Sequence, residues 1–273
     1  MTDTDIIAIS GSTDKYNFHS HTQFCDGRVD MEVMTRAAID AGMQHWGFSP
    51  HSPVPFESPC NMHAGDVETY LSEVERLKGI YGDRISLYAS MEIDYLGDNW
   101  GAATPYFRNL PLDYRIGSVH FVPSDKGYVD VDGSFESFKV KMAEYFSNDI
   151  RHVVNLFYRQ SMAMVEAGGF DIIGHLDKIG HNASLFRPGI EDEDWYCRLV
   201  NDLIDLVIEK DIIAEINTKT YVSAGRFFPS LRYWQRLADA GVKMVVNSDA
   251  HYPERVNLGR DAAFALLKTD NSL

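Results

Sequence analysis

The sequence has little of what stabilises secreted scaffolds. Only three cysteines occur among 273 residues, at Cys25, Cys60 and Cys197, and no two of them form a C-x-x-C pair. A sparse, odd-numbered set of cysteines is typical of reduced thiols and argues against a disulfide framework. We therefore expect a cytoplasmic protein.

Long apolar runs are also missing. No stretch approaches the roughly 18 apolar residues of a membrane-spanning helix. The N-terminal "MTDTDIIAIS" is acidic and lacks the basic and apolar regions of a signal peptide. We therefore expect no association with a membrane.

Basic residues are scarce, with 25 Lys and Arg against 40 Asp and Glu, for a formal net charge of −15. Such a surface argues against nucleic acid or an anionic membrane as the main partner. A small anionic substrate remains compatible with this charge, because bound metal ions can reverse the local field. The charge gives no indication of the oligomeric state.

Apolar residues are plentiful, at 45% with 12% aromatic residues, so the chain can bury a sizeable core. We expect a single domain over residues 1–273, with residues 1–15 as an N-terminal extension. The predicted strands are "KYNFHSH", "HWGFSPH", "ISLYASMEID", "YRIGSVHFV", "FDIIGHLD", "IIAEINT" and "KMVVNSDAH". Segments with helical periodicity alternate with them, at residues 31–42, 66–78, 136–167, 194–209, 230–240 and 254–268.

This alternation predicts the α/β class, with a parallel sheet covered by helices. One closed or nearly closed β/α barrel is the simplest arrangement of seven such strands. A doubly wound open sheet is the alternative. In a barrel, functional side chains lie at the carboxyl ends of the strands.

Side chains of the kind that bind metals follow six of the seven predicted strands. The first strand ends in a His-x-His pair, and an aspartate follows shortly after. Because the carboxyl ends of barrel strands converge on one mouth, these side chains are expected to meet. The nine candidate metal ligands are His19, His21, Asp26, His51, Glu92, His120, His175, Asp249 and His251.

Each of these residues also has an ordinary interpretation when it is taken alone. His51 can be a loop histidine packed by prolines, and His120 and His175 can be buried core histidines. Asp249 is a common type of residue at a helix N-cap. If all of them held, ligand-type residues would stand at the ends of six strands by chance. We therefore prefer a metal site.

Nine imidazoles and carboxylates at one mouth would conflict electrostatically, because carboxylates would take up protons or imidazolium rings would repel one another. Divalent metals remove this conflict, and they prefer such nitrogen and oxygen ligands. The number of ligands exceeds what a single ion takes from protein. We therefore expect two or three divalent ions, of Zn, Fe or Mn, with Glu92 as the bridging carboxylate.

The order of these motifs resembles the polymerase-and-histidinol-phosphatase (PHP) superfamily. The matching segments are the His-x-His pair, "CDG", "FSPHSP", "MEIDY", "DYRIGSVHFV", "FDIIGHLDK", "AEINT" and "NSDAHYP". "GSVHF" and "GHLDK" point more narrowly to the monofunctional histidinol-phosphatase branch. The resemblance runs from about residue 16 to the C-terminal helix, and so covers nearly all of the chain.

The resemblance implies a distorted seven-stranded (β/α)7 TIM-like barrel with a trinuclear metal site. The ligands would be His19, His21, Glu92 and Asp249 for one ion, Glu92, His120 and His175 for a second, and Asp26, His51 and His251 for a third. Some relatives carry a histidine where Asp26 stands. A carboxylate there would shift the preference towards harder ions such as manganese or iron.

The activity that the resemblance implies is hydrolysis of L-histidinol phosphate to histidinol and phosphate, in histidine biosynthesis. We expect direct attack by a metal-bound hydroxide. No Cys-x5-Arg loop or DxDxT motif is present to form a covalent phosphoenzyme. The expected catalytic residues are Glu92, Asp249 and His251. The proton for the leaving alkoxide is expected from the last two or from a water on the third ion.

Substrate-binding residues are predicted from charge and from position near the strand ends. Arginine suits phosphate because its planar fork fits two oxygens, which makes Arg159, Arg187 and Arg226 the candidates. The amino-imidazole end of histidinol is cationic or nearly so. Glu57 and Asp94 are the candidates to receive it.

Three other functions remain open. The same metal site would serve a PHP phosphoesterase that acts on another small phosphate ester, such as a nucleotide. A metal-dependent amidohydrolase also begins with His-x-His, but no lysine stands at the fourth strand end, where "GSVH" is found. A non-catalytic PHP module is disfavoured because all nine ligands are present.

Overall fold

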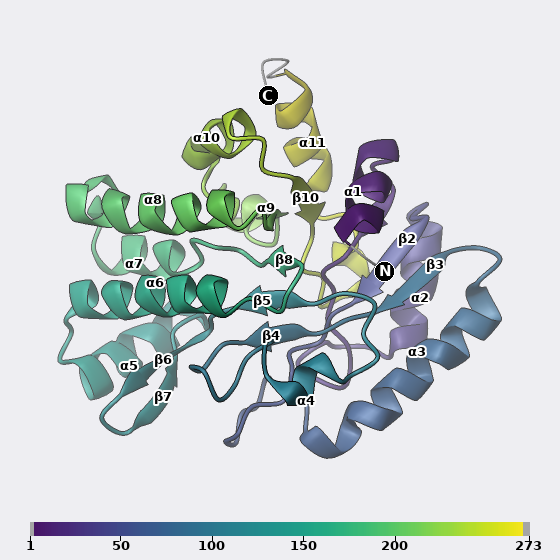
Figure 1. Ribbon diagram of the computed structural model, residues 1–273, viewed down its shortest axis with the longest axis horizontal. Coiled ribbons are helices and arrows are strands. Elements are labelled where there is room, and N and C mark those ends of the chain that lie inside the picture. The colour runs from purple at the N-terminus through teal and green to yellow at the C-terminus, as the bar shows by residue number, and fades with distance from the viewer. Residues whose placement is uncertain (1–2, 270–273) are drawn as a thin grey trace.

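Most of the strands belong to two parallel sheets, and β6 (Phe121–Ser124) and β7 (Gly127–Asp130) form a separate antiparallel pair. The computed structural model describes residues 3–269, in which helices flank the strands (Figure 1). One sheet has the order β1 (Tyr16–Asn17), β2 (His45–Phe48) and β3 (Ser86–Ala89). The other has the order β10 (Met244–Asn247), β9 (Ile213–Asn217), β8 (Ile172–Ile173), β5 (Ile116–Ser118) and β4 (Glu92–Asp94). The predicted α/β class with parallel strands is confirmed.

Helices connect the strands and cover the sheets. Figure 1 shows α6 (Ile150–Ala167) and α8 (Asp194–Glu209) side by side on one flank, and α2 (Met31–Asp40) and α3 (Val67–Tyr81) on the other. The other helices are α1 (Asp3–Ser12), α4 (Pro105–Arg108), α5 (Phe135–Phe146), α7 (Ile179–Phe186), α9 (Tyr221–Ala224), α10 (Trp234–Asp239) and α11 (Arg260–Thr269). Short 3₁₀ turns lie at η1 (Ala64–Asp66), η2 (Ile190–Asp192), η3 (Leu231–Tyr233) and η4 (Pro253–Arg255). Among the described residues no helix is both long and apolar enough to cross a membrane.

The two sheets meet along two seams. At the first seam, the run "ISLYASMEID" is divided: β3 pairs with β2, and β4 pairs with β5. A parallel bridge between His51 and Glu92 joins the sheets there. At the second seam, Ser20 and Ala250 form a parallel bridge between the segments that follow β1 and β10. Both seams therefore involve segments that carry predicted metal ligands.

The predicted helix over residues 136–167 is two helices in the structure. Ser147 (φ 50°) and Asn148 (φ 60°) are left-handed between α5 and α6. The Asp149 side chain then accepts a hydrogen bond from the N–H of His152 at 2.9 Å and caps α6. The apolar spacing continues across this break, which is why periodicity alone did not predict it. By contrast, Gly42 has the positive φ (77°) of the predicted helix stop after α2.

The predicted strand "YRIGSVHFV" is also shorter in the sheet than its apolar run. Only residues 116–118 pair with the parallel strands. From Phe121 the chain enters the antiparallel hairpin of β6 (Phe121–Ser124) and β7 (Gly127–Asp130). His120 therefore lies between the sheet and the hairpin.

Helix α1 is a part of the fold that the sequence did not predict. Its Ile6 side chain is fully buried and belongs to a cluster with Tyr16, Phe18, Tyr114 and Ile116. Figure 1 places α1 between α11 and β2. Within the predicted N-terminal extension, residues 3–12 thus add a helix to the hydrophobic core.

Candidate metal centre

The Glu92 carboxylate lies at the centre of the predicted ligands and is 1% exposed. Strand β4 brings it to the first seam, and the Ser118 hydroxyl donates to its Oε1 at 2.7 Å. Oε1 also faces ring nitrogens of His175 at 2.7 Å and His120 at 3.4 Å. Oε2 faces those of His51 at 3.1 Å, His19 at 3.2 Å and His21 at 3.6 Å. Each oxygen thus serves a different set of imidazoles, which is the geometry of a bridging ligand.

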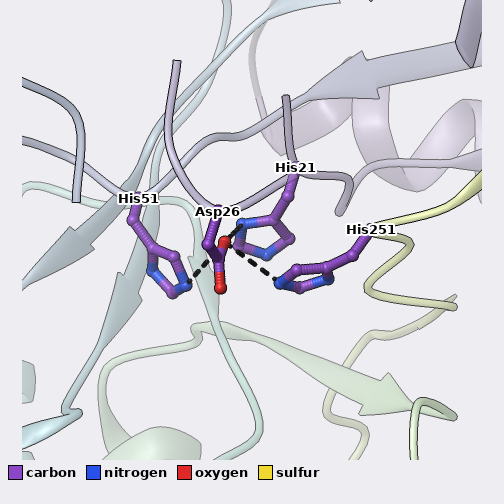
Figure 2. Close-up of side chains that lie close together, drawn as sticks. All are labelled: His21, Asp26, His51 and His251. Atoms are coloured by element: carbon purple, nitrogen blue, oxygen red, sulfur yellow. Dashed lines mark ion pairs between the residues drawn. The ribbon is translucent and has the colours of Figure 1, made fainter. Parts of the chain in front are cut away.

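A second carboxylate, Asp26, lies among three histidines (Figure 2). Its Oδ1 is 3.2 Å from Nε2 of His251, 3.6 Å from Nδ1 of His21 and 3.8 Å from Nε2 of His51. These side chains come from the segments that follow β1, β2 and β10. Asp26 is the most exposed member of this group, at 24% of its side chain.

Further groups complete the centre. Ligand atoms of His19, His21 and Asp249 lie within 4.8 Å of one another, as do those of His51, Glu92 and His120. Nε2 of His175 lies 3.3 Å from Nε2 of His120. The structure therefore brings all nine predicted ligands together.

The donor atoms fit divalent cations. Four buried atoms of the predicted ligands have no hydrogen-bond partner: Nε2 of His19, Nε2 of His21, Oδ1 of Asp26 and Oε2 of Glu92. A buried polar atom without a partner costs about 1–3 kcal/mol, so such a group needs a ligand. Imidazole nitrogens and carboxylate oxygens are the donors that zinc, iron and manganese take from proteins.

The pKa values of two neighbouring histidines, His19 and His21, are shifted in opposite directions. Burial lowers the pKa of His19, but Glu215, Glu92 and Asp249 outweigh burial and raise it well above its usual value. Burial and the nearby His251 and His51 hold the pKa of His21 well below its usual value. Positive metal ions would satisfy the carboxylates without placing protons on adjoining rings.

A cavity of about 750 Å³ opens beside the centre. Asp26, His51 and His120 form part of its wall, so a molecule in the cavity can reach these predicted ligands. The opposite wall comes from the loop after β2 and from the β6–β7 hairpin. The other lining residues include Phe56, Glu57, Asp94, Phe121, Tyr128, Asp130, Asp132, Lys141, Lys178, His181 and Lys219.

This geometry agrees with the comparison to known families. The PHP domain family model matches residues 17–219, which is most of the chain. The chain belongs to the PHP domain family. The resemblance predicted from the His-x-His pair and the motifs that follow it is thereby confirmed.

Relatives of this PHP chain carry histidinol-phosphatase names. The histidinol-phosphatase of Bacillus subtilis is 26% identical over 267 residues, covering 91% of this chain and 97% of its own. A candidate histidinol phosphatase from Listeria monocytogenes has a TM-score of 0.79 at 19% identity, covering 91% and 99% of the two chains. The Lactococcus lactis histidinol phosphate phosphatase, in complex with zinc, L-histidinol and phosphate, has a TM-score of 0.71 at 19% identity, covering 94% of each chain. At this identity, the likeness to the two solved structures concerns the fold.

Glu215 is a functional residue whose role the sequence did not reveal. It lies fully buried in β9, behind His19. Nδ1 of His19 donates to its Oε1 at 2.6 Å, and the N–H of His175 donates to its Oε2 at 3.0 Å. The amides of Asn217 and Asn247 donate to the same carboxylate at 3.1 and 3.0 Å. Glu215 therefore orients His19 so that Nε2 faces the centre, a role that partner carboxylates of metal-binding histidines often have. The signal in the sequence was the acidic residue in "AEINT".

Asp94 has a comparable position behind His120. Its Oδ1 accepts hydrogen bonds from Nδ1 of His120 at 2.8 Å and from its backbone N–H at 3.1 Å. Its Oδ2 accepts from the Asn61 amide at 3.2 Å. Asp94 was predicted to receive the cationic end of the substrate. Because alternate residues of a strand face the same side, β4 points Asp94 and Glu92 towards the same histidine. Asp94 also lines the cavity, so the prediction stays open.

The structure does not bring the three predicted arginines to the cavity. Arg159 is exposed on α6 beside a separate surface hollow. Arg187 forms an exposed ion pair with Glu193. Arg226 is paired with Glu191 at 2.7 Å and with Asp177 at 3.1 Å. Closeness to a strand end in the sequence does not determine which way a side chain on the following segment points. Glu57, by contrast, does line the cavity.

Replacing Glu215 by glutamine is expected to weaken metal binding about 10- to 100-fold, because the amide no longer fixes the orientation and tautomer of His19. The measurement is a competition titration of the metal-loaded protein with a chelator. Asp205→Asn, a change of an exposed carboxylate on α8, is the control. Equal affinities for Glu215→Gln and the unaltered protein would contradict the positioning role.

Metal binding is expected to release protons at pH 7. The raised pKa of His19 means that both ring nitrogens are protonated in the metal-free protein. A metal ion that binds Nε2 must displace the proton on that atom. Affinity should therefore fall as the pH is lowered. Calorimetric titration in two buffers of different ionisation enthalpy counts the released protons. Heats that do not depend on the buffer would contradict this expectation.

Proposed function

We propose that this PHP-family protein is a metal-dependent phosphomonoesterase that hydrolyses L-histidinol phosphate to histidinol and phosphate. The observation that carries the proposal is the central Glu92, whose two oxygens face separate groups of histidines beside a cavity of about 750 Å³. The names of the relatives support the choice of substrate.

The proposed cofactors are two or three divalent ions of Zn, Fe or Mn. Bound at this centre, such ions would lower the pKa of water and neutralise phosphate charge. The proposed ligand sets are His19, His21, Glu92 and Asp249; Glu92, His120 and His175; and Asp26, His51 and His251. Zinc in the Lactococcus lactis structure supports this choice of metal.

Within this proposal the chain's own residues orient the reacting groups. Nδ1 of His251 lies 3.0 Å from the backbone carbonyl of Asp249. A carbonyl only accepts hydrogen bonds, so Nδ1 of His251 carries the ring proton. The lone pair of Nε2, on the side of Asp26, is then free to bind a metal ion. Asp249 and His251 are proposed to orient the group that supplies the proton to the leaving alcohol, and the buried Glu92 holds the two groups of histidines together.

The proposal takes the two sheets as one distorted seven-stranded barrel. The bridges at the two seams support this interpretation, because they connect the neighbours that a closed barrel requires. In such a barrel, β3 and β4 are the two halves of one strand position.

Metal analysis and activity measured on the same sample test the proposal. The purified protein is analysed for Zn, Fe and Mn, and its kcat/KM is determined for histidinol phosphate and for a panel of nucleotides and other phosphate monoesters. We expect two or three metal equivalents and a preference for histidinol phosphate of at least about tenfold, or ~1.4 kcal/mol.

A stronger preference for another ester would replace the substrate and retain the metal-dependent phosphoesterase. Hydrolysis of cyclic amides without phosphatase activity would favour the amidohydrolase alternative. Absence of bound metal, with no activation by added metal, would overturn the proposal as a whole.

A further inference from the structure

The cations that line the cavity are lysines. Lys141, Lys178 and Lys219 contribute to its wall, and no arginine does so among the described residues. We propose that Lys178 and Lys219 bind the phosphate group of the substrate, in place of the arginines that a phosphate site would commonly use. This inference rests on the proposed function for its choice of phosphate as the ligand.

Lys219 lies directly at the metal centre. It follows β9, and its side chain is 24% exposed. Its Nζ is 3.1 Å from Oδ1 of Asp249 and 3.4 Å from Nε2 of His251. These two acceptor atoms within 3.4 Å fit an ammonium ion at Lys219. A divalent ion at Asp249 would compete for the same oxygen and direct this charge towards the cavity.

Lys178 reaches the cavity from the segment that follows β8. Its side chain is 7% exposed, and its Nζ is 3.3 Å from Oδ1 of Asp132. The same Nζ lies 4.9 Å from the centre of the Phe228 ring, which restricts its direction. Its backbone N–H donates to the carbonyl of His175 at 2.8 Å. Lys178 is thus tied to a proposed metal ligand and is nearly enclosed.

The two lysines act on the same part of the cavity. Both line the cavity whose wall also includes the candidate ligands Asp26, His51 and His120. Asp132, which pairs with Nζ of Lys178 at 3.3 Å, lies on the wall of this cavity too. A phosphate in contact with the metal centre would meet positive charge from both lysines.

Each of the two ammonium groups already pairs with a carboxylate, so each can pair with a phosphate oxygen in the place of that carboxylate. A phosphate dianion carries more charge than Asp132 or Asp249, and the flexible lysine stem can exchange one acceptor for another. Lys141 differs from these two, because it pairs at 2.7 Å with Asp130 on the hairpin and also borders an outer surface hollow. We therefore assign phosphate binding to Lys178 and Lys219 alone.

The test is calorimetric titration of the metal-loaded protein with inorganic phosphate. Lys178→Met and Lys219→Met should each weaken phosphate binding about 10- to 100-fold, the effect of losing one charge-assisted hydrogen bond. Asp132→Asn should strengthen binding, because it releases Lys178 and removes a negative charge. Lys178→Arg and Lys219→Arg should restore most of the affinity. Lys139→Met, at an exposed position of α5, is the matched control.

Metal content and circular dichroism are measured for every variant, which separates loss of phosphate binding from loss of metal or fold. Unchanged phosphate affinity in Lys178→Met and Lys219→Met, at full metal content, would overturn the inference. Weaker binding in Asp132→Asn would do so too.

If the proposed function is wrong but the phosphate site is real, activity and phosphate binding will give different results. The protein would then hydrolyse no phosphate ester, while inorganic phosphate would still bind in a manner that depends on the two lysines. Conversely, an active phosphatase whose KM and phosphate affinity do not respond to either lysine would retain the function and reject this inference.

Discussion

Replacing Glu92 by glutamine is expected to lower kcat/KM for the phosphate ester about 10³-fold, or ~4 kcal/mol of transition-state stabilisation. Glu92 is the residue whose two oxygens face both groups of histidines, from 2.7 Å at His175 to 3.6 Å at His21. Glutamine keeps the shape but removes the negative charge and one of the two acceptor oxygens. The variant side chain would then no longer hold two cations between the two groups of histidines.

Metal analysis shows whether the loss of activity in Glu92→Gln has this cause. We expect fewer bound equivalents of metal, while thermal unfolding of the metal-free protein changes little. Glu68→Gln, an exposed position on α3, is the control and should retain both metal and activity. Full metal content with full activity in Glu92→Gln would contradict the bridging role.

Replacing Arg260 by methionine is expected to lower the free energy of unfolding by about 3–5 kcal/mol. The Arg260 side chain is 1% exposed. It donates to the carbonyls of Asp14 at 3.0 Å and Val246 at 3.2 Å, and also to the carbonyl of Tyr16. Methionine has a similar length but leaves these carbonyls without their donor.

The position of Arg260 explains why the effect should be large. One guanidinium at the start of α11 joins the segment around β1 to β10, which are the first and last strands of the two sheets. Burial lowers the pKa of Arg260 to about 10, so the group stays charged at neutral pH and needs these acceptors.

Urea unfolding, followed by circular dichroism, measures the change in Arg260→Met. Arg255→Met is the matched control, because Arg255 is exposed in η4 and lies over the Tyr252 ring. Arg260→Lys should lose part of the stability, since one ammonium cannot serve all the carbonyls. Equal stability of Arg260→Met and the control would contradict the joining role.

The clustering of the nine candidate ligands was largely predictable from the sequence. Each candidate lies in or just after an apolar strand run, and strand runs are short, local patterns that can be recognised without tertiary information. Parallel strands then bring their carboxyl ends to one edge, so the register of the ligands along the chain predicts their meeting. His19 and His175 lie far apart in the sequence, yet their rings are 5.9 Å apart in the structure.

The residues around the ligands were less predictable. Glu215 and Asp94 stand beside histidines only because neighbouring strands pair in one register. The direction of the Arg226 side chain depends on Glu191 and Asp177, which come from other segments. Lys178 and Lys219 likewise reach the cavity through contacts with distant carboxylates. No local pattern contains this information.

Some elements of the fold were hidden for the same reason. The apolar run over β3 and β4 is continuous in the sequence. It is divided only because β3 pairs with β2 and β4 pairs with β5. Helix α1 has no clear amphipathic pattern in the sequence, and its Ile6 is buried through contacts with strands. The division between α5 and α6 lies in two left-handed residues, Ser147 and Asn148, which interrupt no apolar repeat.

The sequence by itself determined the fold class, the order of the strands and the chemistry of the donor atoms, because these depend on residue type and on local spacing. Only the tertiary structure decided which oxygen of Glu92 faces which histidine, which carboxylates support the ligands and which cations line the cavity. Those features depend on side-chain direction and on contacts between segments that are distant along the chain. The two seams between the sheets, at His51–Glu92 and Ser20–Ala250, set these contacts where the candidate metal ligands converge.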